Sequence, residues 1–205
     1  MLAPLAAEFV AAHPGLRLHL AIGNRHVAPV GDGYDLVVRV GPLADSSLRA
    51  RRLARSSLVV VASPDCLARH SEPDCLEAVA RLPCLAFGDP GEARWHCGRP
   101  GEPALPVQAA FAADDMDVLR QAALAGLGFA LLPRFVAGRE IEAGSLRVLA
   151  LSADLVPVEV HAVYPGHRIP GPGARALADF LQRRMARLPH WIGEPPAAEA
   201  PAAGR

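Results

Sequence analysis

Three carboxylates stand almost side by side in the second half of the chain: Asp114, Asp115 and Asp117. Clustered carboxylates can bind a metal ion or share a proton in catalysis, and they can also stabilise the positive N-terminal end of a helix. An apolar stripe at helical spacing follows them directly, from Val118 to Ala123. Helix capping is therefore the favoured interpretation, and a ligand site or a catalytic site is the alternative.

The other candidate groups are four cysteines, Cys66, Cys75, Cys84 and Cys97. They lie nine or more residues apart, without the C-x-x-C spacing of zinc sites. His96 does precede Cys97, but neighbours in sequence rarely bind one metal together. We therefore predict free, mostly buried thiols, with no metal and no cofactor. Neither Gly-x-Ser-x-Gly nor His-Glu-x-x-His occurs, so no catalytic residue and no enzyme activity are predicted.

The composition limits the partners of the chain. Its 205 residues include 21 basic and 21 acidic side chains, so the overall positive field typical of nucleic-acid or anionic-membrane binding is missing. No stretch approaches the ~20 apolar residues that span a bilayer, and no secretory signal is visible. A cytoplasmic protein with no membrane partner is expected. A local basic patch could touch DNA phosphate, but it is more typical of a solvated or subunit-contact face: Arg49, Arg51, Arg52 and Arg55.

Alternating helices and strands must position these residues. In the first half, the pattern predicts a helix over 2–10, strands over 16–22, 35–41 and 58–62, and two short helices after Ser63 and Asp74. In the second half it predicts strands over 85–87, 107–111, 129–133, 146–149 and 158–164, a short helix from Asp114 to Gly126, and a long helix ending near Leu188. Gly126 and Gly128 lack the third glycine of a dinucleotide-binding fingerprint, so we interpret them as a helix end and a tight turn.

Several runs, in this order and spacing, closely resemble the effector-binding domain of LysR-type transcriptional regulators. The resemblance covers about residues 2–188, and the run from Asp45 to Arg52 is similar to the CrgA-like subgroup. The runs that carry it are Tyr34-Asp35-Leu36-Val37-Val38-Arg39-Val40-Gly41-Pro42-Leu43, Asp45-Ser46-Ser47-Leu48-x-Ala50-Arg51-Arg52-Leu53, Ala122-Ala123-x-Ala125-Gly126-Leu127-Gly128-Phe129 and Pro157-Val158-x-Val160-x-Ala162-Val163-Tyr164-Pro165.

The resemblance implies an α/β fold like that of the type 2 periplasmic binding proteins, with two αβ lobes of mixed sheets joined by two crossover strands. We place the crossovers near 58–63 and 156–164, with hinge residues Ala62, Ser63 and Ala162. Lobe 1 would then combine 1–62 with 156–188, and lobe 2 would be 63–155. The Pro- and Ala-rich segment 189–205 is expected to be disordered.

Carried over by position, the family's effector site combines residues from both lobes. Ligands of such sheets lie beyond the carboxyl ends of strands, where helix N-termini offer free N–H groups. Arg39 could add a bidentate contact to an acidic effector, or it could pair with a neighbouring carboxylate such as Asp35 or Glu8. The implied effector-binding residues are Gly23, Asn24, Arg39, Gly41, Pro42, Asp114, Asp115, Met116 and Phe129.

The resemblance implies a ligand-sensing regulatory domain that binds a small carboxylate or aromatic effector and controls transcription. Relatives bind DNA through an N-terminal helix-turn-helix module and associate as dimers or tetramers. This sequence begins at the family's first helix, so we expect the DNA-binding module, the linker helix and the first strand of lobe 1 to be missing. Loss of that strand would expose the edges of two hydrophobic strands. A solute-binding protein of the periplasmic type is the alternative.

Overall fold

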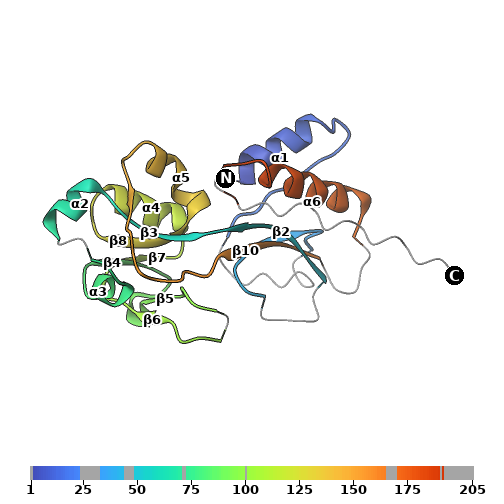
Figure 1. The fold of residues 1–205 in the computed structure, drawn as a ribbon. Coiled ribbons are helices and arrows are strands. Elements are labelled where there is room, and N and C mark those ends of the chain that lie inside the picture. Colours follow the sequence, from blue (N-terminus) through green and yellow to red (C-terminus); the bar gives the residue numbers. More distant parts are fainter. Residues whose placement is uncertain are drawn as a thin grey trace.

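The computed structural model describes residues 2–23, 33–43, 49–70, 73–99, 101–164, 170–189 and 191, and these form two αβ lobes (Figure 1). Lobe 1 is built from the two ends of the chain, and lobe 2 from the part between them. The elements of lobe 1 are helices α1 (Leu2–Ala11) and α6 (Pro172–Met185) and strands β1 (Val37–Val40), β2 (Arg49–Ser56) and β10 (Val158–Tyr164).

Lobe 2 is organised around a five-stranded sheet in the order β7-β4-β8-β3-β9. Strand β4 pairs in parallel with β7 and β8, whereas β3 pairs antiparallel with β8 and β9, so the sheet is mixed. Its strands are β3 (Leu58–Ala62), β4 (Cys84–Phe87), β7 (Ala109–Ala113), β8 (Phe129–Pro133) and β9 (Arg147–Val148). Around it lie α2 (Pro64–Arg69), α3 (Leu76–Ala80), η1 (Pro90–Glu92), the hairpin of β5 (Arg94–Trp95) and β6 (Leu105–Pro106), α4 (Met116–Leu124) and α5 (Arg134–Glu142).

Both faces of the lobe 2 sheet are buried. Side chains alternate along a strand, so β3 contributes Val59 and Val61 to one core and Val60 and Ala62 to the other. The first core packs under α4 and α5, and the second packs under α2, α3 and the hairpin. This double cover explains why β3 is apolar at every position.

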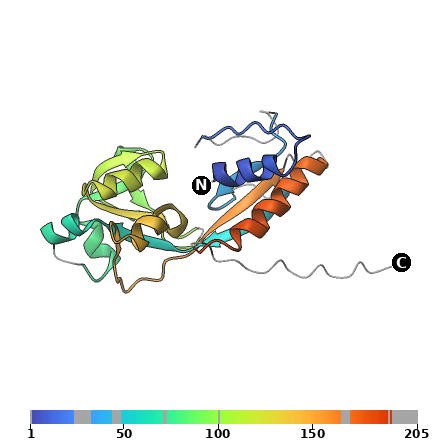
Figure 2. The ribbon, with the colours of Figure 1, turned by 90° about the horizontal axis from the view of Figure 1, so that it is seen from above.

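The main apolar core of lobe 1 lies on one face of its sheet. Its sheet, in the order β1-β10-β2, is antiparallel at both described pairings, and α1 and α6 lie together on one side of it (Figure 2). Leu53, Val160 and Tyr164 point to that side and pack with Leu5 and Leu181 of the helices. Phe9 of α1 contacts Phe180 of α6, with ring centroids 5.3 Å apart.

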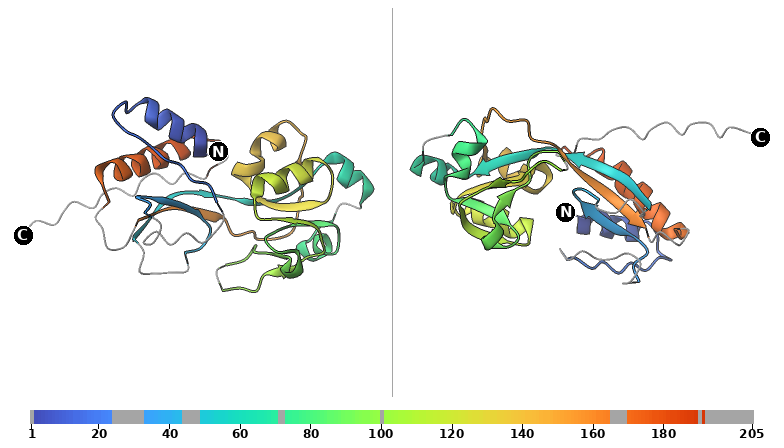
Figure 3. Two further views of the ribbon diagram at one scale, coloured as in Figure 1. Left: turned by 180° about the vertical axis from the view of Figure 1, so that it is seen from behind. Right: turned by 90° about the horizontal axis from the view of Figure 1, so that it is seen from below.

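The chain passes between the lobes twice, and the first passage lies at Ser57. Strand β2 ends at Ser56 in the lobe 1 sheet and β3 begins at Leu58 in the lobe 2 sheet, so the two run almost as one ribbon (Figure 3). The second passage lies between Val156, whose N–H still donates to the Cys97 carbonyl of lobe 2 at 3.0 Å, and Val158, where β10 begins. Both passages belong to a hinge-like region between the lobes, called the crossover below.

The lobe boundary therefore differs from the predicted one. Because β3 already pairs within lobe 2, Ala62 and Ser63 lie inside that lobe, where Ala62 faces Arg147 and Ser63 caps α2. Ala162 lies inside lobe 1, in the middle of β10. The three predicted hinge residues therefore do not lie where the chain passes from one sheet to the other. Hydrogen-bond pairing decides which sheet a strand joins, and a hydrophobic run in the sequence does not reveal that pairing.

Three local predictions also need correction. The alternating segment 16–22, predicted as a strand, makes no strand pairing in the described part of the chain, and Ile22 is 82% exposed. The sequence predicts no strand over 49–56 and no helix over 134–142, yet β2 and α5 occupy these ranges. Only some residues of strand β2 are buried, and four of its eight residues are arginines. It therefore lacks the alternating apolar pattern by which strands are recognised in a sequence.

Helix caps follow the sequence more closely. The Ser63 hydroxyl accepts a hydrogen bond from the Cys66 N–H at 3.2 Å, as its position before Pro64 predicts. The second predicted cap, at Asp74, is displaced, because α3 begins at Leu76 and Cys75 takes the cap position without a side-chain bond. Gly126 follows α4 with a φ of 76°, which confirms its role at a helix end.

Candidate functional site

The carboxyl ends of three parallel strands meet at the side of lobe 2 that adjoins the crossover. Pro133, the last residue of β8, lies opposite Leu58, the first residue after the crossover. Strands β4 and β7 run parallel to β8, so Phe87 and Ala113 end on the same side. We call this side the interlobe edge of lobe 2. Ligands of αβ sheets lie beyond such edges, so it is the first place to look for a site.

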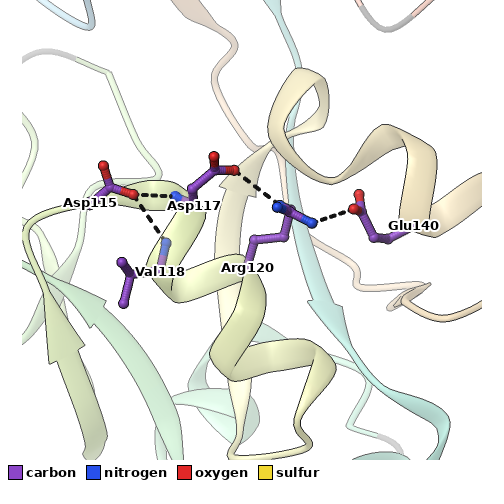
Figure 4. A network of polar contacts seen from close by, with 5 residues as sticks. All are labelled: Asp115, Asp117, Val118, Arg120 and Glu140. Carbon is purple, nitrogen blue, oxygen red and sulfur yellow. Dashed lines mark hydrogen bonds and ion pairs between the residues drawn. The ribbon is translucent and has the colours of Figure 1, made fainter. Parts of the chain in front are cut away.

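Helix α4 begins at this edge, and Asp115 caps it (Figure 4). One Asp115 carboxylate oxygen accepts hydrogen bonds from the N–H groups of Asp117 at 2.8 Å and Val118 at 3.1 Å. The capping interpretation of the acidic cluster is therefore confirmed. It also has an electrostatic consequence: a carboxylate of the chain already occupies the positive end of α4, so an anionic ligand gains little there.

The rest of the acidic cluster is tied into the lobe 2 scaffold. Arg120 donates a hydrogen bond to Asp117 at 3.1 Å and another to Glu140 of α5, which joins the two helices (Figure 4). Asp114 and Asp115 are exposed at the edge, and Met116 is half-buried beside them. Of the predicted site residues, these three are brought together at the interlobe edge.

Phe129 lies elsewhere. It is the first residue of β8, opposite Cys84 at the start of β4, and it is completely buried in the core under α2 and α3. A five-residue strand separates it from the interlobe edge by roughly 13 Å. The structure therefore does not group Phe129 with Asp114, Asp115 and Met116, because the direction of β8 sends its first residue to the opposite end of the sheet.

Phe87 is the aromatic residue that sequence reasoning missed. It is the last residue of β4, it lies opposite Ala113, and it is 47% exposed. The other three residues of β4 are buried, so the exposure of this large apolar side chain at the end of the strand stands out. The available signal was its position directly before Gly88, where the apolar run stops.

Lobe 1 contributes a second edge near the crossover. Strand β10 begins there, and β1 runs antiparallel to it, so β1 ends there. Val40 lies opposite Val160, and the Gly41 N–H donates to the Glu159 carbonyl at 2.8 Å. Gly41 and Pro42 are thus at the interlobe side of lobe 1. Gly23 is exposed in the unpaired segment after α1, and Asn24 lies outside the described residues.

Arg39 lies on the face of the lobe 1 sheet that is turned away from α1 and α6. The strand register places Arg39 opposite His161, which in turn lies opposite Arg52. Glu159, one step nearer the crossover, accepts from Arg52 at 3.0 Å and lies 3.3 Å from the His161 Nε2 atom. The charges described on this face are mainly positive, and farther from the crossover the face carries Val37 and the buried Val163.

The carboxylates that the sequence suggested as partners of Arg39 do not pair with it. Glu8 accepts hydrogen bonds from Arg184 of α6 at 2.9 and 3.2 Å instead. No hydrogen bond or ion pair joins Arg39 to another residue among those that the structure describes. Arg39 as a whole residue is half-buried.

The basic patch is largely engaged within lobe 1. Arg51 pairs with Asp179 and Gln182 of α6, and Arg52 and Arg55 approach Glu159. These pairs hold β2 to α6 and to β10. They give the arginines of this strand a structural role, whatever else they contact.

Among the described residues, the possible metal ligands are dispersed, and the thiols of Cys66 and Cys84 are buried. No group of three His, Cys, Asp or Glu side chains there is arranged to hold a metal ion. Burial raises the pKa of the Cys84 thiol to about 12 and also raises the pKa of Cys66, so both thiols stay protonated and unreactive near neutral pH.

A shallow cavity of about 400 Å³ lies between α3 and the segment 105–108, and no predicted site residue lines it. None of the helices described there is long and apolar enough to cross a bilayer.

Comparisons with known proteins agree with this architecture. Residues 1–186 match the family described as LysR substrate binding domain. The chain is 34% identical over 190 residues to the HTH-type transcriptional regulator CrgA of Neisseria meningitidis, covering 90% of this chain and 62% of that protein. It is 29% identical to the Escherichia coli regulator DmlR, covering 91% of this chain and 61% of that one. The chain thus spans about three fifths of the length of these relatives.

Solved structures give the same result. The regulatory domain of CrgA superimposes with a TM-score of 0.74 at 32% identity, covering 90% of this chain and 91% of that one. The full-length Vibrio cholerae virulence activator AphB gives a TM-score of 0.69 at 26% identity, covering 90% of this chain and 63% of that one. The similarity therefore extends over both lobes.

Proposed function

The chain belongs to the LysR family through its substrate-binding domain, and we propose that this domain holds a small carboxylate or aromatic effector between its two lobes. The family is one of transcriptional regulators and not of enzymes. The domain is the effector-binding regulatory part of such a regulator. The observation that carries the proposal is the meeting of the strand ends of both lobes at the crossover, with Arg39 unpaired among the described residues.

The distribution of charge suggests how the effector is oriented. Asp115 fills the N-terminal end of α4, so lobe 2 presents carboxylates and an exposed Phe87. Lobe 1 presents Arg39 on a face whose charges are mainly positive. A carboxylate effector would therefore turn its anionic group to Arg39, where a bidentate pair can form, and its apolar or aromatic part to Phe87 and Met116.

Binding to both lobes would connect effector recognition to conformation. A ligand shifts the equilibrium between two lobe arrangements only by its difference in affinity for them. An effector that contacts Arg39 in lobe 1 and Phe87 in lobe 2 favours the arrangement in which both are within reach. In an intact regulator that shift would pass to an N-terminal DNA-binding module and to associated copies of the chain in a dimer or tetramer, and it would act in the cytoplasm, where the chromosome is.

A thermal-shift screen tests the proposal. The 205-residue chain is heated with a panel of aromatic and small carboxylic acids, and binding raises the melting temperature because the ligand stabilises only the folded state. We expect at least one hit that Arg39→Ala abolishes and Phe87→Ala weakens. Arg139→Ala is the matched control, because Arg139 is an exposed arginine on α5. If Arg39→Ala retains the full shift, the carboxylate contact assigned to Arg39 is wrong.

A second assay separates the regulator from a solute-binding protein. The family match favours the regulator, although the fold class is shared. A gel-shift assay with the longer protein that contains this domain, with and without the hit, would give the deciding result. An effect of the hit on DNA binding supports the regulator, and tight ligand binding without any DNA binding supports the alternative.

A further inference from the structure

Helix α5 is the lobe 2 helix that lies nearest to lobe 1 (Figures 1 and 2). Its first turn is attached to the crossover by two backbone donors. The Arg134 N–H donates to the Ser57 carbonyl at 2.8 Å, and the Phe135 N–H donates to the Ser56 hydroxyl at 3.3 Å. The first N–H groups of a helix have no partner within the helix, so these bonds satisfy groups that would otherwise need water. Ser56 is completely buried at this point.

The side chain of Phe135 extends this attachment into lobe 1. It comes from lobe 2, yet it packs against the lobe 1 core that contains Leu53 and Val160. Its ring stacks on Trp191, with centroids 4.4 Å apart and planes inclined by 4°. Trp191 follows α6, is 8% exposed, and donates its backbone N–H to the Leu188 carbonyl at 3.2 Å. This tryptophan lies in the segment 189–205 that the sequence predicts as disordered.

We propose that Phe135 and Trp191 form an aromatic clasp that fixes the angle between the two lobes. The two rings come from different lobes and meet beside the crossover, so a rotation of one lobe against the other must slide or separate them. Nearly parallel stacking depends strongly on the relative position of the rings. The clasp thereby favours one lobe arrangement, and Trp191, which follows α6, contributes to that preference. It does not depend on which effector, if any, the domain binds.

The test measures the distance between the lobes directly. Spin labels are placed at Arg139→Cys on α5 and Arg183→Cys on α6, two exposed positions, in a background with Cys75→Ser and Cys97→Ser. Cys66 and Cys84 are buried and are left in place. Pulsed electron paramagnetic resonance then gives the distribution of distances in the unliganded chain. We expect Phe135→Leu and Trp191→Leu to raise the population outside the parent distance peak by about 2- to 12-fold, the factor that one aromatic pair corresponds to.

A matched control lies within lobe 1. Phe180→Leu removes a ring from the Phe9–Phe180 pair, which packs α1 on α6 and does not bridge the lobes. It should leave the distance distribution unchanged. The inference is overturned if both clasp variants, folded by circular dichroism, give the parent distribution, or if Phe180→Leu changes the distribution equally.

Hydrogen exchange keeps the inference testable if a leucine variant fails to fold. Trp191→Phe retains a smaller ring and should weaken the clasp partly. The Arg134 and Phe135 amides, which donate to the crossover, should then exchange faster than in the parent chain, while amides in β3 stay protected. Unchanged exchange at the start of α5 would contradict the clasp.

Discussion

The two lobes bury their sheets in different ways. Lobe 2 covers both faces of a five-stranded sheet, with one core under α4 and α5 and another under α2, α3 and the hairpin. Lobe 1 places α1 and α6 over one face, and its other face combines the polar side chains of Arg39, His161 and Arg52 with the completely buried Val163. Lobe 2 therefore has an apolar core on each side of its sheet, whereas the described apolar core of lobe 1 is concentrated under its two helices.

The largest loss of stability is expected in lobe 2, whose sheet is covered on both faces. Phe129→Ala removes a completely buried ring and should lower the free energy of unfolding by about 3–5 kcal/mol, measured by urea denaturation. Phe180→Ala in lobe 1 removes a half-buried ring, and we expect it to cost about 1–3 kcal/mol. Equal costs would remove the proposed difference between the lobes.

Gly128→Ala should come next. A Cβ at this position would lie 2.2 Å from the Pro83 carbonyl oxygen, a backbone atom that accepts the Phe129 N–H at 2.9 Å. The turn into β8 must shift to admit it, and we expect a loss of about 1–3 kcal/mol in urea unfolding. Gly15→Ala in lobe 1 is the control, since its Cβ would meet nothing within 4 Å. A neutral Gly128→Ala would show that the turn adapts more easily than this contact suggests.

The cap of α4 should have an intermediate effect. Asp115→Ala leaves two N–H groups of the first turn without their partner and should cost about 0.5–2 kcal/mol in thermal or urea unfolding. Asp115→Asn keeps an accepting oxygen and should restore most of the stability. If the asparagine variant is as unstable as the alanine variant, the charge of Asp115 matters more than its hydrogen bonds.

The cost of losing an ion pair should differ between the lobes, and the smallest effect of all is expected for the exposed pair of lobe 1. Arg51→Ala in lobe 1 breaks a pair with Asp179 in which the side chains are 41% and 43% exposed, so we expect at most about 1 kcal/mol, reduced by salt. Arg120→Ala in lobe 2 breaks a pair with Glu140 in which they are 17% and 19% exposed, and we expect about 1–3 kcal/mol. Urea unfolding at low and high salt measures both. The reverse order would contradict the link between burial and the cost of losing a charge partner.

The candidate site was predictable where a local pattern carries the information. Asp115 caps α4 because an acid directly before an apolar helical stripe is a local signal, and Gly126 ends the same helix for an equally local reason. Arg39, Gly41 and Pro42 come from the family resemblance, and their contact with an effector stays a prediction. Phe129 and Phe87 show the limit. Both are aromatic residues at strand ends, and only the direction of the strands in the sheet decides which end faces the crossover.

By itself, the sequence determined the α/β class, most helices and strands, the caps of α2 and α4, and the family through the order and spacing of its runs. These features follow from side-chain periodicity and from contacts between near neighbours. Only the tertiary structure decided that the lobes change at Ser57 and that β2 is a strand despite its arginines. It also decided that α5 meets Trp191, 49 or more residues farther along the chain. Those outcomes depend on pairing and packing between segments that lie far apart in the sequence. A local sequence pattern does not reveal which distant segments will meet.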